Sequence, residues 1–258
     1  MIDTHSHIYD EAFDEDIAQV IERAQIFGVK KILLPAVDST SHERLGDLCA
    51  KYPDFCVPMM GVHPTSLTAG NLAQELEIVR VNLSKGGYIA VGEVGLDLYW
   101  SKEFLAEQIT ALKEQISLAL SYDLPLVFHV RDAWEQMLDL LEEYADKGLR
   151  GVMHSFSGDA QIYNRVKSLG EFVFGIGGVV TFKNSGLDKV VNQMNINDLV
   201  LETDAPYLTP VPYRGKRNES SYVRLVAEKI AEIKGMSVDE VIKATSENAR
   251  RIFRLEEF

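Results

Sequence analysis

The chain opens with Met1-Ile-Asp-Thr-His-Ser-His7, a short apolar run that leads directly into an H-x-H pair. A doubly wound dinucleotide-binding sheet would place a glycine-rich turn, G-x-G-x-x-G, after its first strand. Residues 5–7 hold two histidines instead of that turn. The opening stretch therefore favours a closed barrel, in which polar side chains gather where the strands end, and leaves an open doubly wound sheet as the alternative.

The rest of the chain repeats a short apolar run followed by a longer amphipathic segment, which is typical of a parallel sheet covered by helices. The candidate strands span residues 1–4, 29–36, 55–62, 88–92, 124–128, 151–153, 172–175 and 198–201. They show little polar alternation, as expected of strands that are covered on both faces. Eight units in 258 residues match the size of one α/β chain folded as a (β/α)8 TIM barrel.

A further helix is expected after the eighth unit. Val223, Val226 and Ile230 share one face of the helix that completes this unit. Ser237-Val-Asp-Glu240 has the spacing of a capping box and predicts an extra C-terminal helix through about Leu255. Because no linker or low-complexity run divides the chain, we expect residues 1–258 to form a single TIM-barrel domain.

Composition and charge restrict the partners. The chain is 46% hydrophobic and 25% charged, which is ordinary for a globular protein. It carries 26 Lys and Arg against 39 Asp and Glu, a net charge of −13. Nucleic-acid-binding proteins usually present a basic face, so binding to a polyanion through a broad basic surface is excluded. A phosphate-bearing substrate would need positive charge supplied locally.

Cysteine usage and hydropathy indicate the compartment. Cys49 and Cys56 lack C-x-x-C spacing and cannot form the disulfide framework of a secreted protein of this length. The N-terminal residues do not resemble a signal peptide, and no uncharged apolar run of about 18 residues occurs. We expect a soluble, unprocessed cytoplasmic protein with no membrane contact and no obligate protein partner.

Polar side chains follow most of the predicted strands. They are His5, His7, His63, Glu93, His129, His154 and Asp204. Each alone has an ordinary explanation, such as a turn, a buried ion pair or a core histidine. Together they include five of the six histidines, and the strand ends are where barrel enzymes carry their active sites. His42 falls in the second helical segment and is expected at the surface.

Imidazoles and carboxylates without thiolates favour a catalytic site for divalent metal over a closed structural zinc site. Six of the residues would be too many for one tetrahedral ion with an open position: His5, His7, Glu93, His129, His154 and Asp204. We therefore expect two divalent ions bridged by Glu93, with Mg or Mn favoured and Zn a further candidate. Two ions roughly 3.5–4 Å apart can activate a water and stabilise both the attacking and the leaving oxygen of a phosphodiester.

At these residues the sequence resembles the TatD family of metal-dependent deoxyribonucleases, within the amidohydrolase-like barrel superfamily. The similarity spans nearly the whole chain in seven ordered motifs. These are Asp3-Thr-His-Ser-His7, Gly61-Val-His-Pro64, Gly92-Glu-Val-Gly-Leu-Asp97, Phe128-His-Val-Arg131, Gly151-Val-Met-His-Ser-Phe-Ser-Gly158, Glu202-Thr-Asp-Ala-Pro206 and Arg214-Gly-Lys-Arg-Asn218.

The resemblance implies that the six residues proposed above are metal ligands and that Glu93 and Asp204 are catalytic. Asp204 would also orient or deprotonate the water. The resemblance also implies hydrolysis of DNA phosphodiester bonds from a 3′ end, with a single-stranded DNA end as the substrate. Glu93 stands where another branch of the superfamily carries a carboxylated lysine, which disfavours a lactonase or phosphotriesterase.

Further polar and aromatic residues are candidates for substrate binding. His63 and Arg131 are expected near a phosphate, although Arg131 has the alternative of pairing with Asp132. Arg217 and Lys216 are candidates for the nucleic-acid backbone. Three aromatic residues are candidates for stacking on a base: Tyr99, Trp100 and Tyr207.

Two other functions remain open at this point, because a fold does not determine a reaction. One is hydrolysis of an amide or ester, such as an aminoacyl-tRNA bond. The other is a non-catalytic metal-bearing scaffold. An open two-metal site is poorly suited to a structural role, which usually uses a closed four-ligand site.

Overall fold

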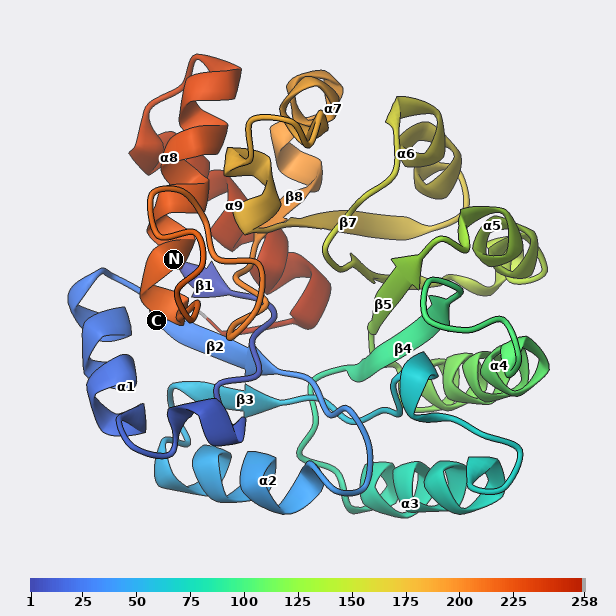
Figure 1. Cartoon of the computed structure of the whole chain (residues 1–258). Coiled ribbons are helices and arrows are strands. Elements are labelled where there is room, and N and C mark those ends of the chain that lie inside the picture. The colour runs from blue at the N-terminus through green and yellow to red at the C-terminus, as the bar shows by residue number, and fades with distance from the viewer. Residues whose placement is uncertain (257–258) are drawn as a thin grey trace.

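The computed structural model describes residues 1–256, so residues 257–258 of the expected domain lie outside the described residues. Within the described part, eight parallel strands lie inside a ring of helices (Figure 1). The strands are β1 (Ile2–Asp3), β2 (Lys31–Leu34), β3 (Cys56–Pro58), β4 (Val91–Asp97), β5 (Leu126–Arg131), β6 (Arg150–Met153), β7 (Glu171–Ile176) and β8 (Leu199–Leu201). The helices are α1 (Ile17–Ile26), α2 (His42–Lys51), α3 (Leu72–Lys85), α4 (Leu105–Ser121), α5 (Trp134–Glu142), α6 (Ala160–Lys167), α7 (Leu187–Gln193), α8 (Val223–Lys234) and α9 (Val238–Phe253).

Backbone hydrogen bonds join the strands into a closed barrel. The strands pair in the orders β1-β2-β3 and β4-β5-β6-β7-β8. Between β3 and β4, the Gly92 N–H donates to the carbonyl of Met60 at 3.0 Å. Between β8 and β1, the Thr4 N–H donates to the carbonyl of Leu201 at 2.9 Å. Both seams are therefore bridged, which confirms the barrel and excludes the open sheet.

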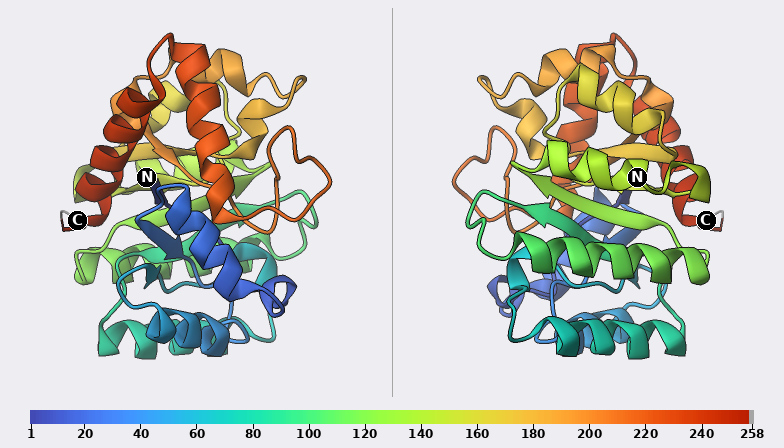
Figure 2. Two further views of the ribbon diagram at one scale, coloured as in Figure 1. Left: turned by 90° about the vertical axis from the view of Figure 1, so that its left-hand side faces the viewer. Right: turned by 90° about the vertical axis from the view of Figure 1, so that its right-hand side faces the viewer.

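The interior of the barrel is apolar, and α9 covers the end of the barrel at which the strands begin. One cluster of buried side chains contains Ile2, Leu33, Met59, Ala90, Val127, Val152, Val173 and Val200, together with Ala249, Ile252 and Phe253 of α9. Figure 2 shows α9 at the end of the barrel where the chain begins, while the long loop after β8 extends from the opposite end. The extra C-terminal helix is thus part of the core.

Local signals in the sequence explain how this helix begins. The Ser237 side chain accepts a hydrogen bond from the N–H of Glu240, and the Glu240 carboxylate accepts one from the N–H of Ser237 at 2.8 Å. The expected capping box is therefore confirmed. The helix ends at Phe253, two residues before the expected boundary.

Strand β4 differs from the expected one, which was placed at residues 88–92. It runs from Val91 to Asp97, and its register against β5 shifts between Gly92 and Val94. Glu93 is the extra residue of this bulge and donates its N–H to the carbonyl of Ala36 at 3.1 Å. β-Bulges occur often beside active sites because they redirect a side chain. Glu93 therefore lies inside a strand and not after one.

No helix among residues 1–256 is long and apolar enough to cross a membrane.

Candidate active site

The polar residues singled out in the sequence meet at the carboxyl end of the barrel, around a cavity of about 1080 Å³. His5 and His7 follow β1, and His154 follows β6 directly. Two others lie within strands, Glu93 in β4 and His129 in β5. The remaining two lie in loops, His63 after β3 and Asp204 after β8. The structure thus brings together residues that are up to 199 positions apart in the chain.

One oxygen of the Glu93 carboxylate faces the H-x-H pair. Oε2 lies 3.1 Å from Nε2 of His5 and 3.6 Å from Nε2 of His7. The two imidazole nitrogens are 3.2 Å apart. Asp204 completes this group, because its Oδ1 lies 3.5 Å from Nε2 of His7.

The other oxygen of Glu93 faces a second group of imidazoles. Oε1 lies 3.0 Å from Nδ1 of His129, 3.5 Å from Nε2 of His63 and 3.8 Å from Nε2 of His154. His154 lies between the groups, since the same nitrogen is 3.7 Å from Oδ1 of Asp204. The two oxygens of Glu93 are therefore directed to two different groups of side chains.

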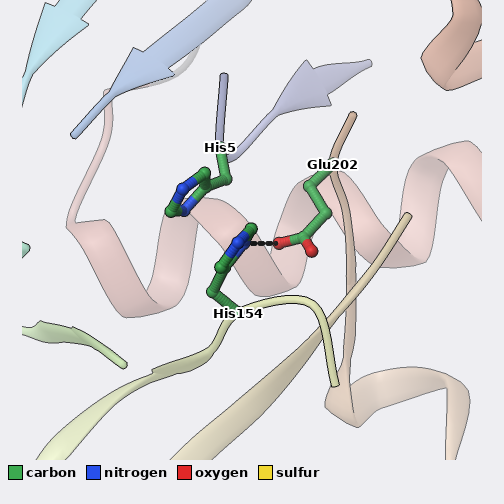
Figure 3. Close-up of side chains that lie close together, drawn as sticks. All are labelled: His5, His154 and Glu202. Carbon is green, nitrogen blue, oxygen red and sulfur yellow. Dashed lines mark ion pairs between the residues drawn. The ribbon is translucent and has the colours of Figure 1, made fainter. Parts of the chain in front are cut away.

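Buried carboxylates hold the outer nitrogens of two of these histidines. Oδ2 of Asp97 lies 2.8 Å from Nε2 of His129. Oε2 of Glu202 forms an ion pair with Nδ1 of His154 at 3.1 Å. Figure 3 marks this ion pair with a dashed line. Glu202 also accepts a hydrogen bond from the N–H of Ser155 at 2.6 Å. A carboxylate behind an imidazole keeps the proton on the outer nitrogen and leaves the inner lone pair free for a cation.

A similar arrangement holds His7. The hydroxyl of Tyr9 donates to the carbonyl of Pro35 at 2.6 Å and lies 2.9 Å from Nδ1 of His7. Since the hydroxyl has already donated its proton, it accepts from the Nδ1–H of His7. The Nε2 lone pair of His7 therefore faces Glu93 and Asp204.

His63 has the opposite tautomer. Its Nδ1 accepts a hydrogen bond from the backbone N–H of Thr65 at 3.2 Å. The proton of a neutral imidazole then lies on Nε2, which faces the cavity. His63 consequently presents a hydrogen-bond donor to the cavity, whereas the inner nitrogens of His129 and His154 offer lone pairs to a cation only after they lose their protons.

The electrostatics of the carboxylates favour their charged forms. Burial raises the pKa of Glu93, but His5, His63, His154 and the hydrogen bond to His129 outweigh burial and hold this pKa well below its usual value. Burial likewise opposes ionisation of Asp204, yet His154 and His7 lower its pKa. Both side chains are therefore negatively charged at neutral pH.

The imidazoles differ among themselves. Burial and the neighbouring His154 lower the pKa of His5 to about 4. Burial acts the same way on His129 and His154, but the carboxylates around them raise these pKa values to about 9 and about 10. A cation that binds these nitrogens must displace their protons, so metal binding is coupled to proton release.

The residues present fit a divalent metal centre. Glu93 is only 3% exposed, and within residues 1–256 no Lys or Arg forms an ion pair with it or with Asp204. Buried carboxylates without a basic partner are typical of sites that bind cations. Three groups have ligand atoms within 4.8 Å of one another: His5, His7 and Glu93; His63, Glu93 and His129; and His5, His154 and Glu202.

The other candidate residues are distributed unevenly. Arg131 lines the cavity and does not pair with Asp132, because its guanidinium lies 3.6 Å from the centre of the Tyr99 ring. Trp100 and Tyr207 also line the cavity. Arg217 is not brought to the cavity and forms an ion pair with Asp16 at 2.7 Å.

Two further outcomes concern residues outside the expected set. His42 is half-buried at the start of α2, not at the surface as expected, because its ring packs inward with a buried Nε2. Asp97 and Glu202 were not predicted as functional. Their positions in two of the quoted motifs could have indicated them. Asp97 is the last residue of β4, four positions after Glu93, and Glu202 directly follows β8, two positions before Asp204.

A barrel with a buried cluster of imidazoles and carboxylates at the carboxyl ends of its strands defines the class of metal-dependent barrel hydrolases. A sequence model of TatD-related DNases matches residues 2–254. The chain belongs to this family and is a metal-dependent hydrolase.

Two curated relatives and one solved structure illustrate the similarity. The chain is 38% identical over 256 residues to the uncharacterized metal-dependent hydrolase YabD of Bacillus subtilis, covering 99% of both chains. It is 33% identical over 261 residues to the 3′-5′ ssDNA/RNA exonuclease TatD of Yersinia pseudotuberculosis, covering 99% of this chain and 100% of that one. The crystal structure of YJJV, a TatD homologue of Escherichia coli, superposes with a TM-score of 0.91 at 29% identity, covering 99% and 98%.

Proposed function

We propose that this hydrolase removes nucleotides from the 3′ end of single-stranded DNA, using two divalent ions. The carrying observation is that the two oxygens of Glu93 face separate groups of imidazoles, 3.1 Å from His5 and 3.0 Å from His129. The relative from Yersinia, named as a 3′-5′ ssDNA/RNA exonuclease, supports a nucleic-acid substrate and the direction of cleavage.

The proposed ligands are the six residues predicted from the sequence. His5, His7, Glu93 and Asp204 would hold one ion, and Glu93, His129 and His154 the other. Mg or Mn would suit the role, with Zn as a further candidate. The ions would supply the positive charge that a phosphodiester requires and that a chain of net charge −13 otherwise lacks.

Asp204 is the proposed general base. Its carboxylate is ionised, and its side chain is 16% exposed, so it is accessible to water in the cavity while Glu93 is enclosed. Its Oδ1 lies between the two groups of ligands, 3.5 Å from His7 and 3.7 Å from His154. Asp204 would therefore orient the attacking water and accept its proton.

His63 and Arg131 are the proposed substrate contacts. The Nε2–H of His63 faces the cavity and would donate to a phosphate oxygen. The guanidinium of Arg131 lies at the cavity rim with its donors free of carboxylates in the described residues 1–256. Arg217, in contrast, would stabilise the fold through its ion pair with Asp16 and would not contact the substrate.

We place the enzyme in the cytoplasm, where Cys49 and Cys56, which form no disulfide, stay reduced.

Substitution of Asp204 tests the assignment. Asp204→Ala in protein reloaded with Mg or Mn should lower kcat on single-stranded DNA by about 100-fold or more, because the general base is lost. Asp188→Ala, an exposed carboxylate of α7 outside the cavity, is the matched control and should keep full activity. Unchanged kcat in Asp204→Ala would contradict the role of Asp204.

The substrate class needs a separate comparison. We expect release of mononucleotides from oligodeoxynucleotides with a free 3′ end, and none when the 3′ end is blocked. The same preparation should be assayed on RNA and on amide and acyl ester substrates, including aminoacyl-tRNA. Faster turnover of an amide or ester than of DNA would contradict the proposed function and favour an amidohydrolase.

A further inference from the structure

Two exposed aromatic side chains lie at the rim of the cavity, in the loop after β4. Trp100 is 72% exposed and Tyr99 is 52% exposed, which is unusual for side chains of this size. Their ring centres are 4.9 Å apart in an edge-to-face arrangement. Exposed aromatic side chains next to a cavity often mark a binding surface.

Arg131 joins these rings to the cavity. Its guanidinium lies 3.6 Å from the centre of the Tyr99 ring and 5.5 Å from that of Trp100. Among the described residues 1–256 the Arg131 guanidinium forms no ion pair with a carboxylate and packs against the two aromatic rings. Trp100 and Arg131 both line the cavity that contains Glu93, so the rim surface is continuous with the metal centre.

The loop is tied to the metal centre through one carboxylate. Oδ1 of Asp97 accepts a hydrogen bond from the N–H of Tyr99 at 3.0 Å. Oδ2 of the same side chain contacts Nε2 of His129 at 2.8 Å. The aromatic rings are therefore held in a defined position relative to the proposed ligand His129.

We propose that Tyr99, Trp100 and Arg131 form a stacking subsite for an unpaired nucleobase next to the scissile phosphodiester. This inference rests on the proposed function and adds where the strand lies. The exposed Trp100 ring offers a face for the base, and Arg131 offers donors to the adjoining phosphate. A cation and aromatic rings together match a single-stranded nucleic acid better than an apolar peptide. Because stacking is tolerant of sequence, no strong base preference is expected.

Tryptophan fluorescence gives a binding test that does not depend on turnover. The chain has two tryptophans, and Trp134 can be removed as Trp134→Phe, because its indole Nε1 is buried without a hydrogen-bond partner. A short phosphorothioate oligothymidylate, added with Mg, should quench the remaining Trp100 emission in a saturable way. Binding should also be measured by the fluorescence anisotropy of a labelled oligonucleotide. Saturable binding in this assay without quenching of Trp100 would overturn the subsite.

Steady-state kinetics of a variant without the Trp100 side chain give the second test. Trp100→Ala should raise KM for oligodeoxynucleotides about tenfold, the loss expected for one stacked base, and leave KM for bis(p-nitrophenyl) phosphate unchanged. Tyr122→Ala, an exposed aromatic at the end of α4 and outside the cavity, is the matched control and should change neither. Equal changes on both substrates, or no change on either, would overturn the inference.

The outcomes separate this inference from the proposed function. Quenching by the oligonucleotide without cleavage of DNA by the wild type would contradict the exonuclease and support the subsite. Cleavage of DNA with no quenching and no change in Trp100→Ala would support the exonuclease and contradict the subsite. Quenching by an aromatic peptide at lower concentration than by the oligonucleotide would also overturn it.

Discussion

The tautomers of single histidines decide what each can do. His154 has Glu202 at its Nδ1, so the proton that a cation must displace is the one on Nε2. His63 has a backbone N–H at its Nδ1, so its Nε2 carries a proton and donates. Two side chains of the same type, both close to Oε1 of Glu93, therefore have different proposed roles.

Substitution of Glu202 by Gln should weaken metal binding. Glu202→Gln keeps the acceptor for the Ser155 N–H but presents an amide N–H to Nδ1 of His154, which favours the wrong tautomer. We expect metal affinity about 10- to 100-fold lower by calorimetry, with the fold retained by circular dichroism. Asp188→Asn should bind metal like the wild type. Unchanged affinity in Glu202→Gln would contradict this positioning role.

At the scale of elements, the pairing of β4 with β5 carries much of the site. The bulge at Glu93 changes which residues of β4 face β5, and Gly95 lies opposite His129 in the register. Gly95 has φ +147°, and a Cβ at this position would lie 1.9 Å from the carbonyl oxygen of His129. Only glycine allows the two strands to approach this closely.

A methyl group at Gly95 should therefore separate the strands. Gly95→Ala is expected to lower the free energy of unfolding by about 3 kcal/mol, in the upper range for overpacking, and to weaken metal binding. Denaturant unfolding and calorimetry measure both effects. Gly46→Ala, on the exposed face of α2 with no atom within 4 Å of the added carbon, should stabilise by up to about 1 kcal/mol. A stable, metal-binding Gly95→Ala would contradict the steric argument.

At the scale of the molecule, ion pairs hold the first and last units of the barrel together beside the seam of β1 and β8. Arg217, in the loop after β8, contacts Asp16 before α1 at 2.7 Å. Arg23 of α1 contacts Glu219 at 2.6 Å. Because the partners are about 200 residues apart in the chain, these contacts form only when the barrel closes.

The Asp16 pair predicts a pH dependence of stability. The hydrogen bond from Arg217 lowers the pKa of Asp16 below its unfolded value of 3.8. The stabilisation is therefore present above pH 3.8 and is lost as pH falls through the lower folded pKa. Asp16→Asn should cost about 1 kcal/mol at neutral pH, and its deficit should shrink below pH 3.8.

Denaturant unfolding across this pH range measures the effect. A deficit that stays constant down to low pH would contradict the ion-pair origin. Arg217→Ala should show a loss of stability with KM for DNA unchanged. A raised KM with unchanged stability would instead restore Arg217 as a substrate contact.

Much of the architecture could be predicted because it depends on local patterns. The alternation of apolar runs with amphipathic helices gave the order of the elements, and Ser237 with Glu240 located the start of α9. The strand boundaries were less accurate, since the bulge at Glu93 depends on β3 and β5 and not on its own segment. The same limit explains Arg217, whose partner Asp16 has no neighbouring signal in the sequence.

By itself, the sequence determined the repeated strand and helix units and the residue types that gather at the strand ends. The opening His5 and His7, with Glu93 among the later residues, indicated metal chemistry before any contact was known. Tertiary structure alone decided which oxygen of Glu93 faces which imidazole and which ring nitrogen carries a proton. The physical reason is that the protonation of each ring depends on the groups beside it, and Glu202 is 48 residues from His154 in the chain but forms an ion pair with it at 3.1 Å in the fold.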